Sequence, residues 1–304
     1  MTLISPRLVV AAVARQVPAE CLPHLVVIGS LAAAYQLLKE TDESSVRTKD
    51  MDCILVPRIE AIPRGEAVAD ALLAAGWQHP SSGLSVAPGT IETPDEDLPV
   101  VRLYPPDSAD WFIELLTVQD AADQRDRAFE RVVLSDGGHY ALATFRFLDV
   151  AAYRPIETPE GIRCARVAML ALSNLLRNPV IRPERMRTPT GLGPKRSNKD
   201  LGRVLTLARL SDRAAVARWP DAWAEALCVL HPRDWTELGQ GAGAGVRALL
   251  ASEGDLREAL EVSRAGLLAS VPMSVDEFRI VAERLLADAV EPLEEAARRA
   301  PGSA

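Results

Sequence analysis

The chain has 304 residues, of which 48% are hydrophobic and 25% charged, and its formal net charge is −8 at pH 7. This length suits about two domains with their own cores, and no apolar run approaches the roughly 20 residues of a membrane span. The N-terminus lacks a signal-peptide layout and the four cysteines are scattered, so we expect a cytoplasmic protein without disulfides or structural zinc.

The first half of the sequence alternates strand and helix patterns. Apolar runs bounded by Gly or Pro predict strands, and a Ser-Asp-Gly-Gly turn at 135–138 predicts a β-hairpin. We predict strands at 25–28, 51–56, 100–104, 111–118, 132–134 and 140–142, helices at 31–38 and 67–75, and a loop or irregular hairpin at 80–99. Residues 1–155 therefore indicate an α/β domain with a mixed sheet.

After Pro159 the pattern changes to the 3.6-residue apolar period of amphipathic helices. The predicted helices cover 162–176, 200–210, 222–230, 246–250, 256–268 and 275–297. Residues 156–304 are therefore expected to form an all-helical domain. Two glycine-containing segments, 190–197 and 239–245, do not fit the spacing or context of phosphate-binding loops, and we predict flexible loops for both.

Two short motifs near the N-terminus carry the most information. Gly29-Ser30 follows a predicted strand at the start of a helix, where backbone N–H groups can bind a phosphate. Asp50 and Asp52 lie two residues apart on the next strand, so their carboxylates point to one face, about 6–7 Å apart along it. Because like charges at that separation repel, the pair favours a bound cation, and together the motifs predict a site for a metal–nucleoside triphosphate complex.

A third acid, Glu114, lies within the apolar strand at 111–118. An isolated charge there is costly unless it is paired or bound to a metal, although a position at a sheet edge is the simpler alternative. Oxygen ligands and phosphates suit Mg²⁺, and two such ions can activate a hydroxyl and stabilise a leaving pyrophosphate.

Residues 177–203 form a basic segment in this acidic chain. The segment holds eight Lys and Arg residues against two acidic ones, a net +6, although the overall charge argues against indiscriminate nucleic-acid binding. The segment could attract an anionic partner, or it could be a solvated loop with arginines at helix ends. Its basic residues are Arg177, Arg182, Arg185, Arg187, Lys195, Arg196, Lys199 and Arg203.

The order of Gly29-Ser30, Arg47-Thr48-Lys49-Asp50-Met51-Asp52 and the strand acid Glu114 resembles the nucleotidyltransferase fold of the polymerase-β-like superfamily. The motif Arg-Thr-x-Asp-Met-Asp is similar to the one in AbiEii-type (MenT-like) nucleotidyltransferase toxins of bacterial toxin–antitoxin systems. Those proteins also carry a Lys-Asp pair on a later helix, matched by Lys199-Asp200. The resemblance covers 25–56 and 110–118, with a short match at 195–205.

This resemblance implies an α/β nucleotidyltransferase domain and roles for individual residues. Gly29 and Ser30 would hold the triphosphate of an NTP. Asp50 and Asp52 would bind one or two Mg²⁺ ions, and Glu114 would complete the ligand set or assist deprotonation of the acceptor. Many superfamily members have aspartate at that third position, so the longer glutamate is a departure.

Further phosphate contacts are implied for Arg47 and Lys199, with Asp200 positioning Lys199 or the base or ribose. From the residues alone, an ordinary loop arginine is the alternative for Arg47. Lys199-Asp200 could likewise be an exposed helix start capped by Asn198.

The resemblance implies a metal-dependent transfer of a nucleoside monophosphate from an NTP to an acceptor hydroxyl. An RNA acceptor such as the tRNA 3′ end is expected, in a toxin that would have a cognate antitoxin as a possible partner. A small-molecule acceptor, as in antibiotic-modifying nucleotidyltransferases, and a catalytically silent nucleotide- or partner-binding module are the alternatives.

Overall fold

The computed structural model describes residues 3–38, 46–80, 87–120, 123, 125, 127–188 and 191–300, without the side chains of residues 187 and 188. The chain divides into two compact units, Met1–Arg166 and Val167–Ala304. Strands β9 (Ile156–Glu157) and β10 (Arg163–Cys164) are hydrogen-bonded into the sheet of the first unit, so this division falls later than a boundary after residue 155. Among the described residues, no helix is both long and apolar enough to cross a membrane.

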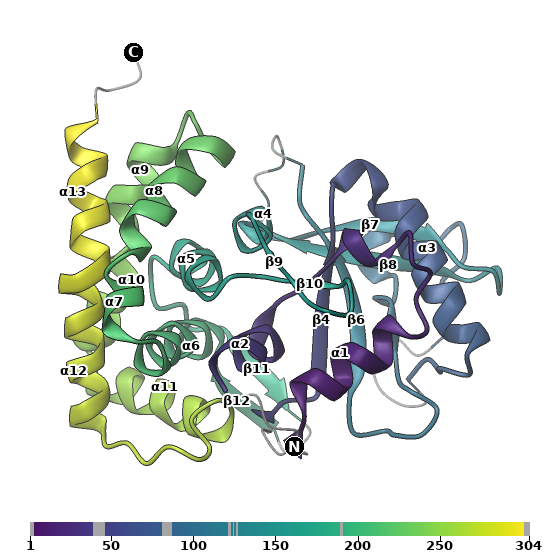
Figure 1. Cartoon of the computed structure of the whole chain (residues 1–304), viewed down its shortest axis with the longest axis horizontal. Coiled ribbons are helices and arrows are strands. Elements are labelled where there is room, and N and C mark those ends of the chain that lie inside the picture. Colours follow the sequence, from purple (N-terminus) through teal and green to yellow (C-terminus); the bar gives the residue numbers. More distant parts are fainter. Residues whose placement is uncertain are drawn as a thin grey trace. The chain divides into compact units, whose positions relative to one another are not determined.

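The first unit is an α/β structure built on a mixed sheet (Figure 1). Its described residues form an eight-stranded sheet in the order β7-β8-β6-β4-β2-β10-β9, with β5 paired to β6. β2 runs antiparallel to β4, whereas β4, β6 and β8 run parallel to one another. Besides β9 and β10, the strands are β2 (Leu25–Val27), β4 (Asp50–Leu55), β5 (Arg102–Leu103), β6 (Phe112–Thr117), β7 (Arg127–Val133) and β8 (His139–Phe145).

The two strands at the centre of this sheet share one burial pattern. In β4 and in β6, the first and third residues are partly exposed, while the second residue and the last three are buried. Met51 and Cys53 on β4, and Ile113 and Leu115 on β6, are fully buried. Alternation along a strand therefore turns one face of its N-terminal half towards the core and leaves the other face for polar side chains.

Three helices of the first unit matter for this arrangement. α1 (Pro6–Ala14) was not predicted from the sequence, α2 (Gly29–Leu37) packs on α1 and β4, and α3 (Arg58–Ala74) packs on β4 and β7. The sequence pattern placed the start of α3 nine residues too late, because Pro63 is typical of a helix breaker but lies inside the helix. The unit also contains β1 (Leu3–Ile4), β3 (Val46–Arg47), α4 (Leu148–Ala151) and the 3₁₀ turns Leu22–His24 and Asp95–Asp97.

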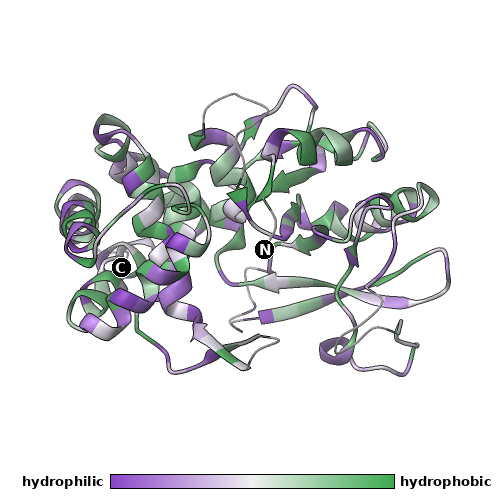
Figure 2. Ribbon diagram, turned by 90° about the horizontal axis from the view of Figure 1, so that it is seen from below, coloured by the Kyte–Doolittle hydropathy of each residue, from purple (hydrophilic) through white to green (hydrophobic). Residues whose placement is uncertain are grey.

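The second unit is mainly helical, and Figure 2 shows alternating hydrophilic and hydrophobic bands on its helices. Trp223 and Phe278 are the largest side chains fully buried in this unit, and the Trp223 indole donates a hydrogen bond to the Ala168 carbonyl. The helices are α5 (Val167–Arg177), α6 (Arg196–Leu210), α7 (Arg213–Val216), α8 (Trp219–Leu230), α9 (Trp235–Gly241), α10 (Ala244–Leu250), α11 (Glu253–Ala265), α12 (Val275–Leu285), the π-turn Leu286–Val290 and α13 (Glu291–Arg299).

The expectation of an all-helical second unit is wrong in one segment. Strands β11 (Arg185–Thr188) and β12 (Gly191–Lys195) form an antiparallel hairpin inside the basic segment. Sequence reasoning missed it because the hairpin lacks the alternation of apolar residues that marks a half-buried strand.

The prediction of a flexible loop at 239–245 is also wrong, because α9 and α10 occupy this segment. Glycine is unfavourable in a helix interior, but here it permits close packing. A Cβ at Gly245 would overlap the carbonyl oxygen of Asn178 at the end of α5. Residues 191–197 of the other predicted loop belong to β12 and the start of α6, and residue 190 lies outside the described residues.

Candidate active site

The amino terminus of α2 lies directly after β2 and presents backbone donors. Its first residue, Gly29, has φ of +72°, a conformation that glycine adopts without strain. The preceding residue, Ile28, has no side-chain oxygen with which to cap the helix. Ile28 therefore supplies no side-chain cap to α2, and the helix dipole favours an anionic group at this end.

The structure brings Asp52 to this helix start. The Ile28 backbone N–H donates to the Asp52 carbonyl at 2.9 Å, which continues the β2–β4 pairing to the end of β2. A Cβ placed on Gly29 would lie 3.0 Å from Oδ2 of Asp52. The Asp52 carboxylate thus lies against the Gly29 backbone, and any larger residue at position 29 would crowd it.

The three predicted acids lie on the same face of adjacent parallel strands. Asp50 and Asp52 occupy the first and third positions of β4, opposite Phe112 and Glu114 on β6. All three acidic residues are partly exposed, whereas the residues between them face the core. The sequence prediction that Asp50 and Asp52 share a face agrees with this register.

Thr48 is a residue of this site that the sequence reasoning passed over. It is only 4% exposed, and its hydroxyl donates a short hydrogen bond to Oδ1 of Asp50. The bond fixes the orientation of the Asp50 carboxylate. The i, i+2 spacing of a threonine and an aspartate before a strand is the signal from which this contact could have been expected.

Arg102 is the second missed residue, and it changes the interpretation of Glu114. β5 pairs antiparallel to β6 with Arg102 opposite Glu114, and the guanidinium forms an ion pair with this carboxylate, its Nε lying 3.1 Å from Oε2. The same guanidinium stacks 4.4 Å from the ring centroid of Phe112. The charge of Glu114 within an apolar strand is therefore compensated by an arginine, without any need for a metal.

The donor set fits Mg²⁺ only in part. In the described part of the chain, no group of three or more His, Cys, Asp and Glu side chains is arranged to hold a metal ion. Asp50 and Asp52 nevertheless suit an ion that arrives with its substrate, since Mg²⁺ is usually bound by one or two carboxylates plus phosphates rather than by an all-protein cage. Glu114, the third acid of the predicted trio, differs from these two in its ion pair with Arg102.

The cysteine beside this site is not a nucleophile at neutral pH. Burial raises the pKa of the Cys53 thiol well above its ordinary value, and the negative charge of Asp52 raises it further. A thiol in that state remains protonated, and only the thiolate is a strong nucleophile.

The remaining predicted residues belong to elements other than β4 and β6. Arg47 is exposed on β3, opposite Leu3 of β1. Lys199 and Asp200 belong to the first turns of α6 in the second unit. Asp200 is buried and accepts a hydrogen bond from Nδ2 of Asn178 at 3.3 Å.

The idea that Asn198 caps an exposed helix start is wrong. α6 begins at Arg196, and Asn198 is fully buried in its first turn. Its amide Nδ2 donates to Asp255 at 2.8 Å and to Glu258 at 2.6 Å, both on α11.

Part of the basic segment is compensated within its own unit. Lys195 Nζ lies 2.7 Å from Asp255 and Arg185 Nη1 lies 2.7 Å from Glu258, so at least these two of its eight cations are ion-paired. Burial alone would raise the pKa of Asp255, but hydrogen bonds from Lys195 and Asn198 outweigh it and lower this pKa. The segment is thus neither a uniform cationic track nor a solvated loop. The side chain of Arg187 lies outside the described residues.

Comparisons of the chain with protein-family models, with curated proteins and with solved structures give no match.

Proposed function

We propose that the first unit is a nucleotidyltransferase that moves a nucleoside monophosphate from an NTP to an acceptor hydroxyl. The observation that carries this proposal is the position of the Asp52 carboxylate against the start of α2, with a Cβ position at Gly29 only 3.0 Å from Oδ2. A phosphate-binding helix terminus and a carboxylate pair next to one another can bind the two parts of a metal–triphosphate complex.

In the proposed reaction, the acceptor oxygen forms a bond to the α-phosphorus, the hydroxyl proton passes to solvent, and the bond to the pyrophosphate oxygen breaks. The backbone N–H groups at Gly29 and Ser30 and the Ser30 hydroxyl bind the phosphates. Asp50 and Asp52 hold the Mg²⁺, and Thr48 keeps the Asp50 carboxylate in its orientation. When bound, the Mg²⁺ supplies charge stabilisation for the phosphoryl oxygens and the departing pyrophosphate.

The test is to incubate the full chain with each labelled NTP, Mg²⁺ and either total RNA or a small-molecule hydroxyl library. We expect label from at least one NTP to appear in one acceptor pool, with release of pyrophosphate. If no NTP gives label in either pool, and no NTP raises the melting temperature, the nucleotidyltransferase proposal fails and a non-catalytic binding module becomes the better interpretation.

Glu114 is expected to contribute less than the β4 acids, because Arg102 already neutralises it. Glu114→Gln should lower the transfer rate by about tenfold at most, which corresponds to about 1.4 kcal/mol of barrier. Initial rates of label incorporation measure this, with the exposed Glu20→Gln as the matched control. If Glu114→Gln lowered the transfer rate as much as an Asp52 variant does, Glu114 would have to be a metal ligand as well.

The acceptor we propose is an RNA 3′ hydroxyl, in line with the resemblance to AbiEii-type toxins, and a cognate antitoxin is proposed with it. Arg196 and Arg203 support RNA binding, since neither has an ion pair among the residues that the structure describes. Unlike Lys195 and Arg185, which form ion pairs with acidic residues of α11, these two arginines remain available to bind phosphates.

An RNA acceptor predicts that the double variant Arg196→Glu/Arg203→Glu binds RNA more weakly and transfers to it more slowly. For single-stranded RNA, the slope of log K against log salt should decrease in magnitude by about 0.7 for each phosphate that is no longer neutralised. Fluorescence anisotropy across a salt series measures this. The control Arg233→Glu/Arg298→Glu makes the same change of charge at exposed positions elsewhere in the unit. Equal behaviour of the two double variants would favour a small-molecule acceptor.

A further inference from the structure

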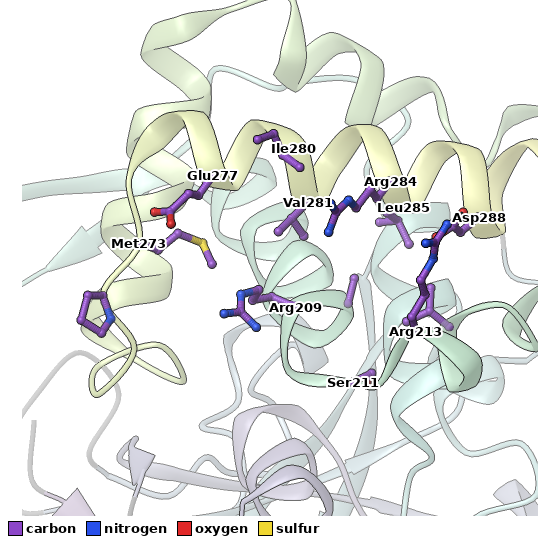
Figure 3. A pocket seen from close by; sticks show the side chains of 13 residues that line it. Arg209, Ser211, Arg213, Met273, Glu277, Ile280, Val281, Arg284, Leu285 and Asp288 are labelled. Atoms are coloured by element: carbon purple, nitrogen blue, oxygen red, sulfur yellow. Dashed lines mark hydrogen bonds and ion pairs between the residues drawn. The ribbon is translucent and has the colours of Figure 1, made fainter.

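A second candidate site lies wholly within the helical unit, between α6, α7 and α12 (Figure 3). The cavity has a volume of about 440 Å³, within the range of roughly 300–1,000 Å³ that small-molecule sites occupy. The carboxyl-terminal turn of α6 and the Ser211 bend form one wall, and the side chains of α12 form the other. None of the sequence motifs pointed to it.

One part of this cavity is apolar. Met273, Val281 and Leu285 line it, with Val216 from α7. Ile280, which also lines the cavity, is 45% exposed. Ile280 is therefore half exposed to solvent beside a cavity with other apolar side chains. A ligand that covers this apolar surface removes it from water, which is favourable.

The charges around the cavity do not cancel. Arg213 forms an ion pair with Asp288 at 3.1 Å. Glu277 accepts hydrogen bonds from the Ser274 backbone and hydroxyl in a capping box, which lower its pKa, and the charge of Arg209 lowers it further. Arg284 has no ion pair or hydrogen bond within the described ranges of the chain.

Arg209 and Arg284 come from opposite walls. Figure 3 shows Arg209 reaching from α6 and Arg284 from α12 towards the space between the two helices. Of the five charged side chains that line the cavity, three are arginines and two are acids, so the cavity carries a surplus positive charge. Guanidinium groups bind carboxylates and phosphates through paired N–H donors.

We propose that this cavity binds a small anionic amphiphile, a carboxylate or phosphate ester that carries an aromatic or aliphatic body. The anionic group binds between Arg209 and Arg284, and the body covers Ile280, Val281 and Met273. The size of the cavity accommodates a two-ring body, and its apolar wall selects against bare inorganic anions. This binding does not depend on the nucleotidyl-transfer proposal for the first unit.

Isothermal titration calorimetry of the full chain with 1-naphthyl phosphate, 1-naphthoate and uncharged 1-naphthol tests this. We expect both anions to bind with one site per chain, and 1-naphthol to bind at least about tenfold more weakly, since charge-assisted hydrogen bonds contribute on that scale. The variant Arg209→Ala/Arg284→Ala should weaken binding of the anions by about tenfold to a hundredfold and leave that of 1-naphthol unchanged.

Two matched controls locate the site. Arg233→Ala/Arg298→Ala removes two exposed arginines elsewhere in the unit and should leave the affinity unchanged. Ile280→Asn should weaken all three probes, whereas Val229→Asn, at a residue 60% exposed on α8, should weaken none. Absence of binding overturns the proposal. So does binding that survives the Arg209 and Arg284 change, which would place the anion elsewhere, including at the start of α2.

Discussion

Replacement of Asp52 by asparagine is expected to lower nucleotidyl transfer by at least about a thousandfold, because several kcal/mol of metal-dependent charge stabilisation disappear with this ligand. The fold should persist. Asp52 and Asp50 carry like charges on one face of β4, so removal of one charge relieves repulsion in the unliganded protein. Initial rates of label incorporation and thermal melting measure the two effects separately.

Asp97→Asn is the matched control, since it removes an exposed carboxylate of the same unit that belongs to the 3₁₀ turn Asp95–Asp97 rather than to β4 or β6. Full activity of Asp52→Asn would exclude Asp52 from the reaction. A melting temperature that collapses with the activity would instead assign Asp52 a structural role at the start of α2.

Gly29→Ala should damage the site through geometry rather than charge. A non-glycine residue at a left-handed φ reduces stability by about 1–2 kcal/mol. The new Cβ would also lie 3.0 Å from Oδ2 of Asp52, so the carboxylate must shift. A displacement on the scale of 1 Å at a catalytic group can cost about a hundredfold in rate, and we expect a decrease in transfer of that order.

Gly137→Ala separates the two effects of this substitution. Gly137 has φ of +78°, similar to the +72° of Gly29, but nothing lies within 4 Å of its Cβ position. Both alanine variants should therefore melt at lower temperature by similar amounts, while only Gly29→Ala transfers more slowly. If both variants keep full transfer rates, the contact between Gly29 and Asp52 has no part in the reaction.

Local sequence patterns were sufficient to predict the elements that build the candidate site. The apolar run before Gly29 predicted β2, and the Ala- and Leu-rich stretch after it predicted α2. The i, i+2 spacing of Asp50 and Asp52 placed both on one face of β4, because alternation along a strand depends only on the backbone. Strand and helix periodicity likewise separated an α/β half from a mainly helical half.

Tertiary structure alone decided which charges meet. Glu114 lies opposite Arg102 because of the register in which β5 pairs with β6. The sequence pattern of the residues between the two strands does not predict that register. Lys195 and Asp255 are sixty residues apart in the chain and pair only because β12 and α6 pack on α11. The glycines of α9 and α10 were misjudged for the same reason, since close helix packing outweighs a local propensity of about 1 kcal/mol.

The sequence by itself determined β2, α2 and the face of β4 on which Asp50 and Asp52 lie, because these follow from backbone geometry over a few residues. The residues that meet this face depend on contacts between distant segments, such as the one between Gly29 and Asp52. Only the folded chain brings those segments together.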